Sequence, residues 1–254
     1  MYYTYYGANS WLLELADCRI LVDPWLVDSL VFFNLPWLFK GDRPRPIDPL
    51  PDNIDLILLS QGLDDHAHRP TLQTLDRTIP VIASPSAAKV VQELGYTTIT
   101  TLSPGDVHGF GERLQIQALS GAPIGLQTEN GYRLTDTRQP FSVYYEPHGY
   151  PPDSLNTMEP VDVVISPVVN LELPLSLPII QGSDSALTLA QRLKPSLFLP
   201  TALGGDVVYS GVLDQLIETV GGVEEFQRRL SACELSTQCL VPSPYERYNT
   251  VVAV

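Results

Sequence analysis

Short runs of β-branched and aromatic residues recur along the whole chain, and each is bounded by Gly, Pro, Asp or Asn. Such runs predict strands, because these side chains fit a pleated surface and the bounding residues favour turns. The strand candidates are SWLLEL, RILVDP, IDLILLS, PVIAS, TTITTL, RLQIQAL, GYRLTD, FSVYYEP, VDVVISP, PSLFLP and QCLVPS.

Three of these runs are continuously apolar rather than alternating: IDLILL, VDVVIS and PSLFLP. Continuous apolar runs predict strands that are covered on both faces, and hence a layered α/β sandwich. In layered α/β proteins, sites form in the loops that follow the carboxyl ends of strands. The segments to weigh are therefore QGLDDHAH, EPHGY and TALGGD, each of which follows a predicted strand.

Helical spacing is confined to fewer places. The candidates are SPSAAKVVQELG from Ser84, SDSALTLAQRLK from Ser183, and the stretch from 211 to 230. We expect the two serines to cap the first two helices, and Gly95 to end the first. Since there is no convincing linker, we expect one domain over residues 1–254.

Charge narrows the classes of partner. The 254 residues include 15 basic and 29 acidic side chains, for a net charge of −14. A protein surface with this excess of negative charge repels phosphate backbones, so we expect no nucleic-acid substrate. We read Cys18, Cys233 and Cys239 as buried thiols of a reducing cytosol. The chain has neither a signal-type N-terminus nor the roughly 18 apolar residues of a membrane span, so we expect a cytoplasmic protein without a transmembrane segment.

The order of these segments resembles the metallo-β-lactamase-fold superfamily, specifically its UlaG-like branch of metal-dependent hydrolases. The resemblance covers most of the chain: YYGANSWLLEL, RILVDP with its Asp-Pro, IDLILLSQGLDDH, PVIASPSAAKVVQELG, the SPGD turn, NGYRL, VYYEPHGY and LKPSLFLPT. It implies a four-layer αββα sandwich, in which two mixed sheets pack face to face with the helices outside.

Much of the family's metal signature is missing. The family places His-x-His-x-Asp-His after the buried strand, where this chain has Gln61, Gly62, Leu63, Asp64, Asp65 and His66. A further histidine is expected near the segment 122–125, which reads Ala-Pro-Ile-Gly. The closing histidine after PSLFLPT falls on Ala202. The resemblance therefore implies that the first of two metal sites is lost.

The second metal site keeps enough donors for one ion. The bridging aspartate of the family aligns with His148, or in a shifted register with Glu146. Asp65, His66 and His148 together would supply one carboxylate and two imidazoles, an acceptable set for one zinc, iron or manganese ion. We expect Glu146 or Asp64 to act as general base.

A non-metal interpretation of the same residues stays open. Asp65 could accept hydrogen bonds from loop amides, and His66 could cap the strand end, in a protein that binds no metal. His68 precedes Arg69 and Pro70, which favours an exposed turn, and His108 lies among turn residues.

Two segments, 25–39 and 168–180, are strongly apolar but interrupted by prolines. We expect them to be loops that rim a pocket for an apolar ligand, form a homo-oligomer contact, or pack on each other as a lid. The first functional hypothesis is a divergent hydrolase with at most one metal ion, acting on an ester or phosphoester of a small, apolar substrate. The alternative is a catalytically inactive member that binds an apolar ligand or a protein.

Overall fold

The computed structural model describes residues 1–125, 127–174 and 177–250. Contacts divide the chain into two compact units. Unit 1 comprises residues 1–102, 204–216 and 242–252, and unit 2 comprises residues 103–203, 217–241 and 253–254. Each unit is thus assembled from separate stretches of the chain. The single domain expected over residues 1–254 stays a prediction.

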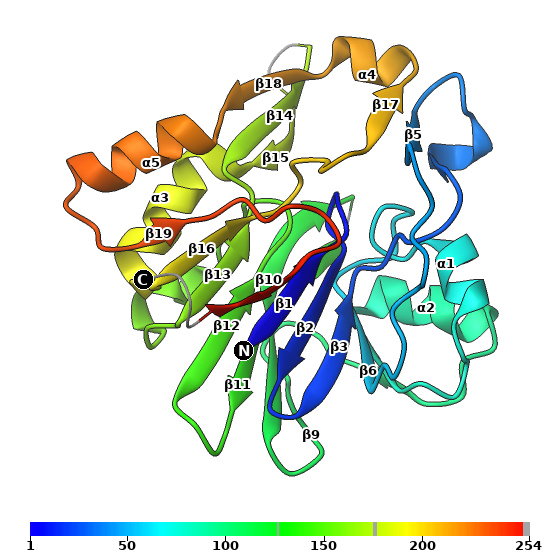
Figure 1. The fold of residues 1–254 in the computed structure, drawn as a ribbon, viewed down its shortest axis with the longest axis horizontal. Coiled ribbons are helices and arrows are strands. Elements are labelled where there is room, and N and C mark those ends of the chain that lie inside the picture. Colours follow the sequence, from blue (N-terminus) through cyan, green and yellow to red (C-terminus); the bar gives the residue numbers. More distant parts are fainter. Residues whose placement is uncertain (126, 175–176, 251–254) are drawn as a thin grey trace. The chain divides into compact units, whose positions relative to one another are not determined.

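Unit 1 is built on a seven-stranded mixed sheet, drawn mainly in blue and cyan in Figure 1. Its first strands are antiparallel hairpins, whereas β3, β6, β7 and β8 run parallel. The order across the sheet is β20 (Arg247–Asn249), β1 (Tyr2–Tyr5), β2 (Trp11–Leu15), β3 (Cys18–Val22), β6 (Leu56–Leu59), β7 (Val81–Ala83) and β8 (Ile99–Thr101).

Two helices follow parallel strands of this sheet: α1 (Arg69–Thr74) after β6, and α2 (Pro85–Glu93) after β7. The hydroxyl of Ser84 accepts a hydrogen bond from the amide of Ala87 at 3.3 Å, which confirms the predicted cap of α2. The other elements of unit 1 are a 3-10 turn (Phe32–Asn34), helix α4 (Val212–Leu216), and a small sheet in the order β17 (Val208–Ser210), β5 (Lys40–Asp42) and β4 (Leu30–Val31).

Unit 2 has its own seven-stranded mixed sheet. Here β12, β13, β16 and β19 are parallel, and β9 to β12 are antiparallel. The order is β19 (Gln238–Cys239), β16 (Leu197–Pro200), β13 (Val163–Ser166), β12 (Phe141–Tyr145), β11 (Gln127–Asp136), β10 (Leu114–Ile124) and β9 (Val107–Phe110). A small sheet adds β15 (Leu177–Gln181), β14 (Val169–Leu173) and β18 (Glu218–Gly221), and a 3-10 helix covers Asp153–Thr157.

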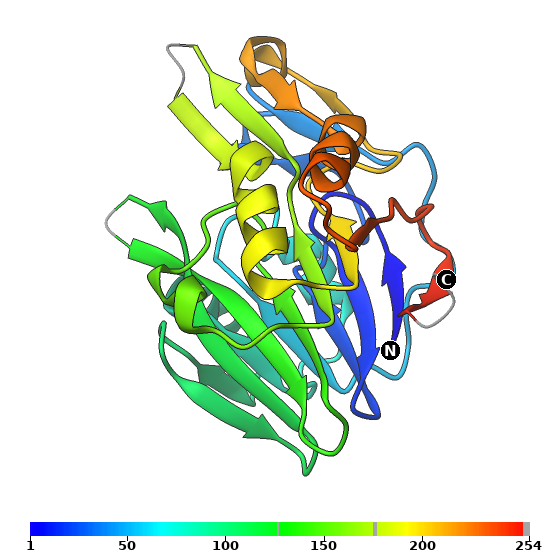
Figure 2. The same ribbon diagram turned by 90° about the vertical axis from the view of Figure 1, so that its left-hand side faces the viewer.

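Helices α3 (Gly182–Leu193) and α5 (Val223–Ala232) lie side by side in unit 2, as Figure 2 shows in yellow and orange. The guanidinium of Arg229 on α5 donates to the Asp184 carboxylate on α3 at 2.7 Å. Both helices contribute to one apolar core with the sheet, including Tyr144 and Phe198. The sequence-based fold class is therefore confirmed: two large mixed sheets with few helices.

All the predicted strands are present, and β6, β13 and β16 are buried along their whole length, as their continuous apolar runs predicted. The helix predictions need two corrections. Ser183 does not cap α3, because the helix begins earlier and Gln181 holds the cap position. The stretch 211–230 is not one helix, since Gly221 and Gly222 take positive φ and end a strand between α4 and α5.

The two apolar segments differ from expectation. Within 25–39, Trp25 and Leu30 are buried in a small core, whereas Phe33 and Trp37 are 71% and 62% exposed. The segment 168–180 forms the β14–β15 hairpin rather than a loop, although residues 175–176 lie outside the described residues.

The three cysteines also differ from one another. Cys239 is buried as predicted, but Cys18 is half-buried and Cys233 is exposed. Across the described residues, no helix combines the length and apolarity needed to cross a bilayer.

Candidate metal centre

The segment after β6 folds into a tight turn that presents Asp65 and His66. The Leu63 carbonyl accepts hydrogen bonds from the amides of His66 at 3.0 Å and Ala67 at 2.8 Å. These short-range bonds wind the backbone as in a helical turn. Asp65 and His66 therefore occupy adjacent positions in the turn that follows β6.

Parallel pairing places Asp23 beside this turn. Because β3 and β6 are parallel neighbours, the residues that follow them, Asp23 and Ser60, meet at one edge of the sheet. The Asp23 carboxylate accepts hydrogen bonds from the Ser60 amide at 2.7 Å and from the Ser60 hydroxyl. Its Oδ2 lies 2.7 Å from Nδ1 of His66. All three residues are buried.

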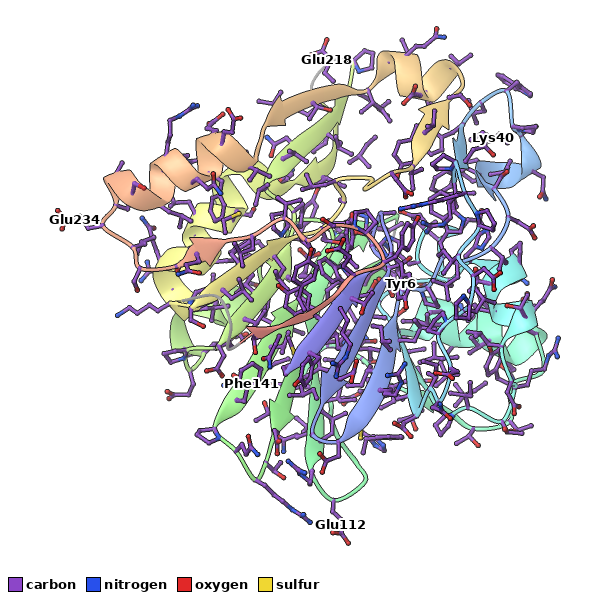
Figure 3. All side chains as sticks on the ribbon, viewed as in Figure 1. Tyr6, Lys40, Glu112, Phe141, Glu218 and Glu234 are labelled. Carbon is purple, nitrogen blue, oxygen red and sulfur yellow. The ribbon has the colours of Figure 1, made fainter. Side chains whose placement is uncertain are left out.

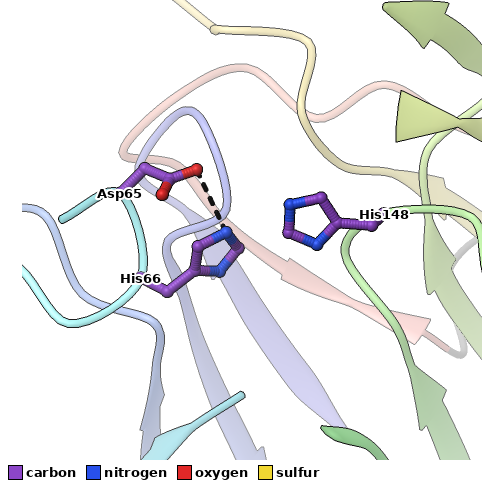
Figure 4. A group of neighbouring side chains, drawn as sticks. All are labelled: Asp65, His66 and His148. Carbon is purple, nitrogen blue, oxygen red and sulfur yellow. Dashed lines mark ion pairs between the residues drawn. The ribbon is translucent and has the colours of Figure 1, made fainter. Parts of the chain in front are cut away.

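The other imidazole nitrogen of His66 faces a second carboxylate. Nε2 lies 3.0 Å from Oδ2 of Asp65, the ion pair drawn in Figure 4, and 3.4 Å from Nδ2 of Asn9. Burial by itself would lower the pKa of His66, but the charges of Asp65 and Asp23 outweigh it and raise this pKa to about 10. The buried ring is thus held between two carboxylates, of which Asp23 is buried and Asp65 is partly exposed.

The geometry of this pair fits a metal ion. Two ligand atoms on a tetrahedral zinc, each bound at about 2.0–2.1 Å, lie roughly 3.3 Å apart, and Oδ2 of Asp65 is 3.0 Å from Nε2 of His66. The bond from Nδ1 to Asp23 leaves Nε2 as the nitrogen that can bind a metal, an arrangement in which a carboxylate fixes a histidine ligand. The donor types, carboxylate and imidazole, suit zinc, iron or manganese.

The other two predicted site residues, Glu146 and His148, belong to unit 2. Glu146 directly follows β12 and is fully buried. Its Oε1 accepts the amide of His148 at 3.1 Å, and its Oε2 accepts the amide of Tyr150 at 2.7 Å. The carboxylate therefore shapes the loop that carries His148.

The loop around His148 is also held from the side of α3. The His148 carbonyl accepts the amide of Gln181 at 2.8 Å, and the Ser185 hydroxyl donates to the Gly149 carbonyl at 2.6 Å. Gly149 has φ +78°, and a Cβ there would lie 2.4 Å from the Gln181 carbonyl oxygen. Only glycine fits this close approach, so the backbone on both sides of His148 is fixed.

His68 contradicts the expected exposed turn. It is 2% exposed and caps α1: Nδ1 lies 3.0 Å from the Thr71 hydroxyl, and Nε2 lies 3.4 Å from the Ser29 carbonyl. Burial lowers the pKa of His68 to about 4, so the ring is neutral. Pro70 is the first-turn proline of this helix, a position that proline favours.

Three residues of this network have no role assigned from the sequence: Ser60, Asn9 and Asp23, of which only Asp23 is noted, as part of an Asp-Pro. The available signal was positional, because Asp23 and Ser60 each lie at the carboxyl end of a predicted strand run, RILVDP and IDLILLS. Their partnership depends on which strands are neighbours, and that is long-range information.

Comparisons with known proteins agree with this architecture. The sequence matches the family described as "Beta-lactamase superfamily domain" over residues 2–202. No relative among the curated proteins matches.

Among solved structures, the isothiocyanate hydrolase from Delia radicum gut bacteria has a TM-score of 0.70 at 15% identity, with 98% of each chain covered. Igni18, a metallo hydrolase from Ignicoccus hospitalis, has a TM-score of 0.66 at 14% identity, with 97% of each chain covered. The metallo-beta-lactamase fold protein YhfI from Bacillus subtilis has a TM-score of 0.58 at 19% identity, covering 97% of this chain and 98% of that one. At these identities, the likeness establishes the fold.

Proposed function

Because the chain belongs to the β-lactamase superfamily, we propose that it is a metal-dependent hydrolase in which Asp65, His66 and His148 bind one metal ion. The observation that carries the proposal is the Asp65–His66 pair. Oδ2 of Asp65 and Nε2 of His66 are 3.0 Å apart, close to the spacing of two ligand atoms on one metal ion, and the Asp23 carboxylate contacts the other ring nitrogen, Nδ1. Asp65, His66 and His148, drawn in Figure 4, are all of side-chain types that could bind a metal ion.

A single ion is proposed because the other expected ligands are missing. Gln61 and Leu63 stand at the first two histidine positions of the loop, and Ala202 stands at the closing one. An amide is a poor donor for zinc, and the two apolar side chains are no donors at all. One bound metal ion would lower the pKa of a coordinated water, which is the chemistry that hydrolysis of an ester or phosphoester would need.

For the general base we favour Asp64 over Glu146. Both oxygens of Glu146 accept backbone amides, so this carboxylate is already engaged in holding its loop. Asp64 is the neighbour of a proposed ligand and is only partly buried. We propose a small, apolar substrate, in keeping with the isothiocyanate named for one structural relative.

Elemental analysis tests the metal. Protein purified without added metal should carry close to one equivalent of zinc, iron or manganese, and His148→Ala and Asp65→Asn should each lose it. His66→Ala should also lose the metal, but it is the least informative of the three variants, because removing a buried ring between two carboxylates also endangers folding. His108→Ala is the matched control, since His108 lies on β9 and outside the proposed ligand set.

Two results would contradict the proposal: metal-free protein whose thermal stability is the same in zinc and in chelator, or metal content unchanged in His148→Ala. Hydrolysis of p-nitrophenyl esters, bis-p-nitrophenyl phosphate and phenyl isothiocyanate, each with and without metal, then separates the substrate classes.

A catalytically inactive binding protein is the second candidate. It draws on Phe33 and Trp37, two large exposed apolar side chains of one segment, since an apolar patch on a protein surface tends to mark a contact surface. Phe33 also has φ +57°, an uncommon backbone conformation for a bulky residue. A metal-free protein that co-purifies with an extractable apolar ligand would favour this alternative.

A further inference from the structure

Unit 2 contains an open cavity of about 400 Å³. It lies where β12 and β13 begin and where α3 ends; Phe141, labelled in Figure 3, is the first residue of β12 and lines it. This volume falls within the range of about 300–1,000 Å³ that is typical of small-molecule sites.

Polar side chains cross the sheet in a row at this cavity. Thr135 on β11 is the register partner of Ser142 on β12. The Asp162 amide donates to the Ser142 carbonyl at 3.0 Å, and the Ser196 amide donates to the Asp162 carbonyl at 3.1 Å. Three hydroxyl-bearing side chains and one carboxylate therefore line the cavity together.

Two cations, Arg133 and Lys194, also line the cavity. Among the described residues, neither has a carboxylate partner within ion-pair distance. The guanidinium of Arg133 makes one long hydrogen bond, from Nη2 to the Pro160 carbonyl at 3.5 Å, and its Nε is buried without an acceptor. A buried donor without a partner is costly. Unpaired cations are notable in a chain with 29 acidic and 15 basic residues.

Asp162 does not neutralise this pair of cations. Its Oδ2 accepts the Ser142 amide at 2.7 Å, which ties the carboxylate to the sheet edge. With one carboxylate against two cations, the cavity keeps a positive charge. A metal cation would find a single carboxylate there and two like charges, so an anion is the complementary ligand.

We propose that this cavity binds a small organic anion, a phosphate or carboxylate group attached to an apolar body. Arg133 offers the planar fork of donors that suits an oxyanion, and Lys194 and the hydroxyls of Ser142 and Thr135 supply further donors. The ring of Phe141 supplies an apolar wall.

This site is separate from the proposed metal ligand of the same unit. Ser142 lies near the start of β12, and Glu146 follows its end. Four residues of extended strand span about 13 Å. The anion site therefore does not depend on the proposed hydrolase function, and either proposal can fail without the other.

Calorimetric titration tests the anion site. The full chain is stripped of metal, dialysed free of chelator and titrated with phenyl phosphate, benzoate and inorganic phosphate in Tris chloride at about 0.15 M ionic strength. At least one probe should bind with a one-to-one stoichiometry. Comparing the three probes shows whether the anionic group is a phosphate or a carboxylate and whether the apolar body contributes.

The variants Arg133→Gln and Lys194→Gln should each weaken binding about tenfold or more, because each removes charged hydrogen bonds to the anion. Lys194 is exposed, so this variant remains informative if Arg133→Gln fails to fold. Arg192→Gln is the matched control: it removes the same charge from α3, but Arg192 does not line the cavity.

Three results would overturn the proposal. The first is that none of the probes binds at up to roughly 10 mM. The second is that binding is unchanged in both cavity variants, which would place the anion elsewhere. The third is that Arg192→Gln weakens binding as much as the cavity variants, which would indicate general attraction to surface charge.

Discussion

Asp23 holds two strand ends together and orients a histidine with the same carboxylate. One oxygen accepts the Ser60 amide, and the other lies 2.7 Å from Nδ1 of His66. Because a buried carboxylate must find strong donors, this arrangement makes the imidazole position dependent on residue 23. Asp23 therefore contributes both to the stability of this end of the sheet and to the position of His66, a proposed metal ligand.

We predict that Asp23→Asn weakens metal binding by about 10–100-fold, because the ring loses its fixed orientation. It should also lower the free energy of unfolding by about 1–3 kcal/mol, since a buried charged hydrogen bond is lost. Competition with a chromophoric chelator measures the first effect, and urea unfolding of metal-free protein measures the second.

Asp55→Asn is the control, because Asp55 also accepts a backbone amide, that of Arg19, but at an exposed place on the same sheet. Metal affinity should be unchanged in this variant. Equal affinities in the Asp23→Asn and wild-type proteins would show that Asp23 has no part in positioning His66.

At the scale of elements, the loop after β12 is fixed from two directions. The Glu146 carboxylate accepts the amides of His148 and Tyr150, and the chain entering α3 bonds to the His148 carbonyl through Gln181. The β14–β15 hairpin and α3 therefore help to set the position of His148, although no residue of either is a proposed ligand.

We predict that Glu146→Gln leaves the fold intact but weakens metal binding about tenfold. A glutamine has one acceptor oxygen in place of two, so one of the two loop amides loses its partner. Metal affinity and the absorption spectrum of a cobalt-substituted protein are the readouts, because a purely structural role would leave the cobalt spectrum unchanged.

Glu112→Gln is the matched control, since Glu112 is an exposed acid of the same unit that pairs with Arg138. If Glu146→Gln binds metal as tightly as wild type and gives the same cobalt spectrum, the loop does not depend on this carboxylate.

At the scale of the whole molecule, burial of phenols and a thiol makes stability depend on pH in the alkaline range. Burial raises the pKa values of Tyr3 and Tyr96 from 10 to about 12, and that of Cys239 from 9 to about 12. Below about pH 9, the folded protein and the unfolded chain both keep most of these protons, so the contribution of these groups to the free energy of unfolding is fully present. Between pH 9 and 12 the unfolded chain loses protons that the folded protein retains.

The free energy of unfolding should therefore fall as the pH rises from about 9 to about 12. Urea unfolding at several pH values measures this decline. Tyr96→Phe should make this decline with pH less steep, because one of the groups that retain a proton in the folded protein is gone. The variant also loses the 2.8 Å hydrogen bond from the Tyr96 hydroxyl to the Leu72 carbonyl. A free energy of unfolding that is constant over this range would contradict the prediction.

Several features of the fold could be predicted from the sequence, and His68 shows why others could not. Strand runs such as IDLILL and the Ser84 cap depend on neighbours a few residues away, and both predictions are confirmed. His68 was predicted to be exposed because Arg69 and Pro70 follow it. Its burial depends on Ser29, which is 39 residues distant in the chain.

The candidate site divides in the same way. Asp65 and His66 could be singled out from their place after a buried strand, and their ion pair is a local contact. The role of Glu146 as an acceptor for two loop amides depends on how the chain turns after β12, so the sequence alone left it as a candidate base. The assignment of His148 to the same metal as Asp65 and His66 remains a proposal.

The sequence by itself determined where most strands of the two large sheets lie, which of them are covered on both faces, and which loops carry carboxylates and imidazoles. These properties follow from side-chain period and turn chemistry, which act over a few residues. Only the tertiary structure decided which polar groups meet. Asp23 and Ser60 are 37 residues apart in the chain. They hold one histidine because β3 and β6 pair in parallel, and strand pairing is selected by burial across the whole sheet rather than by local sequence.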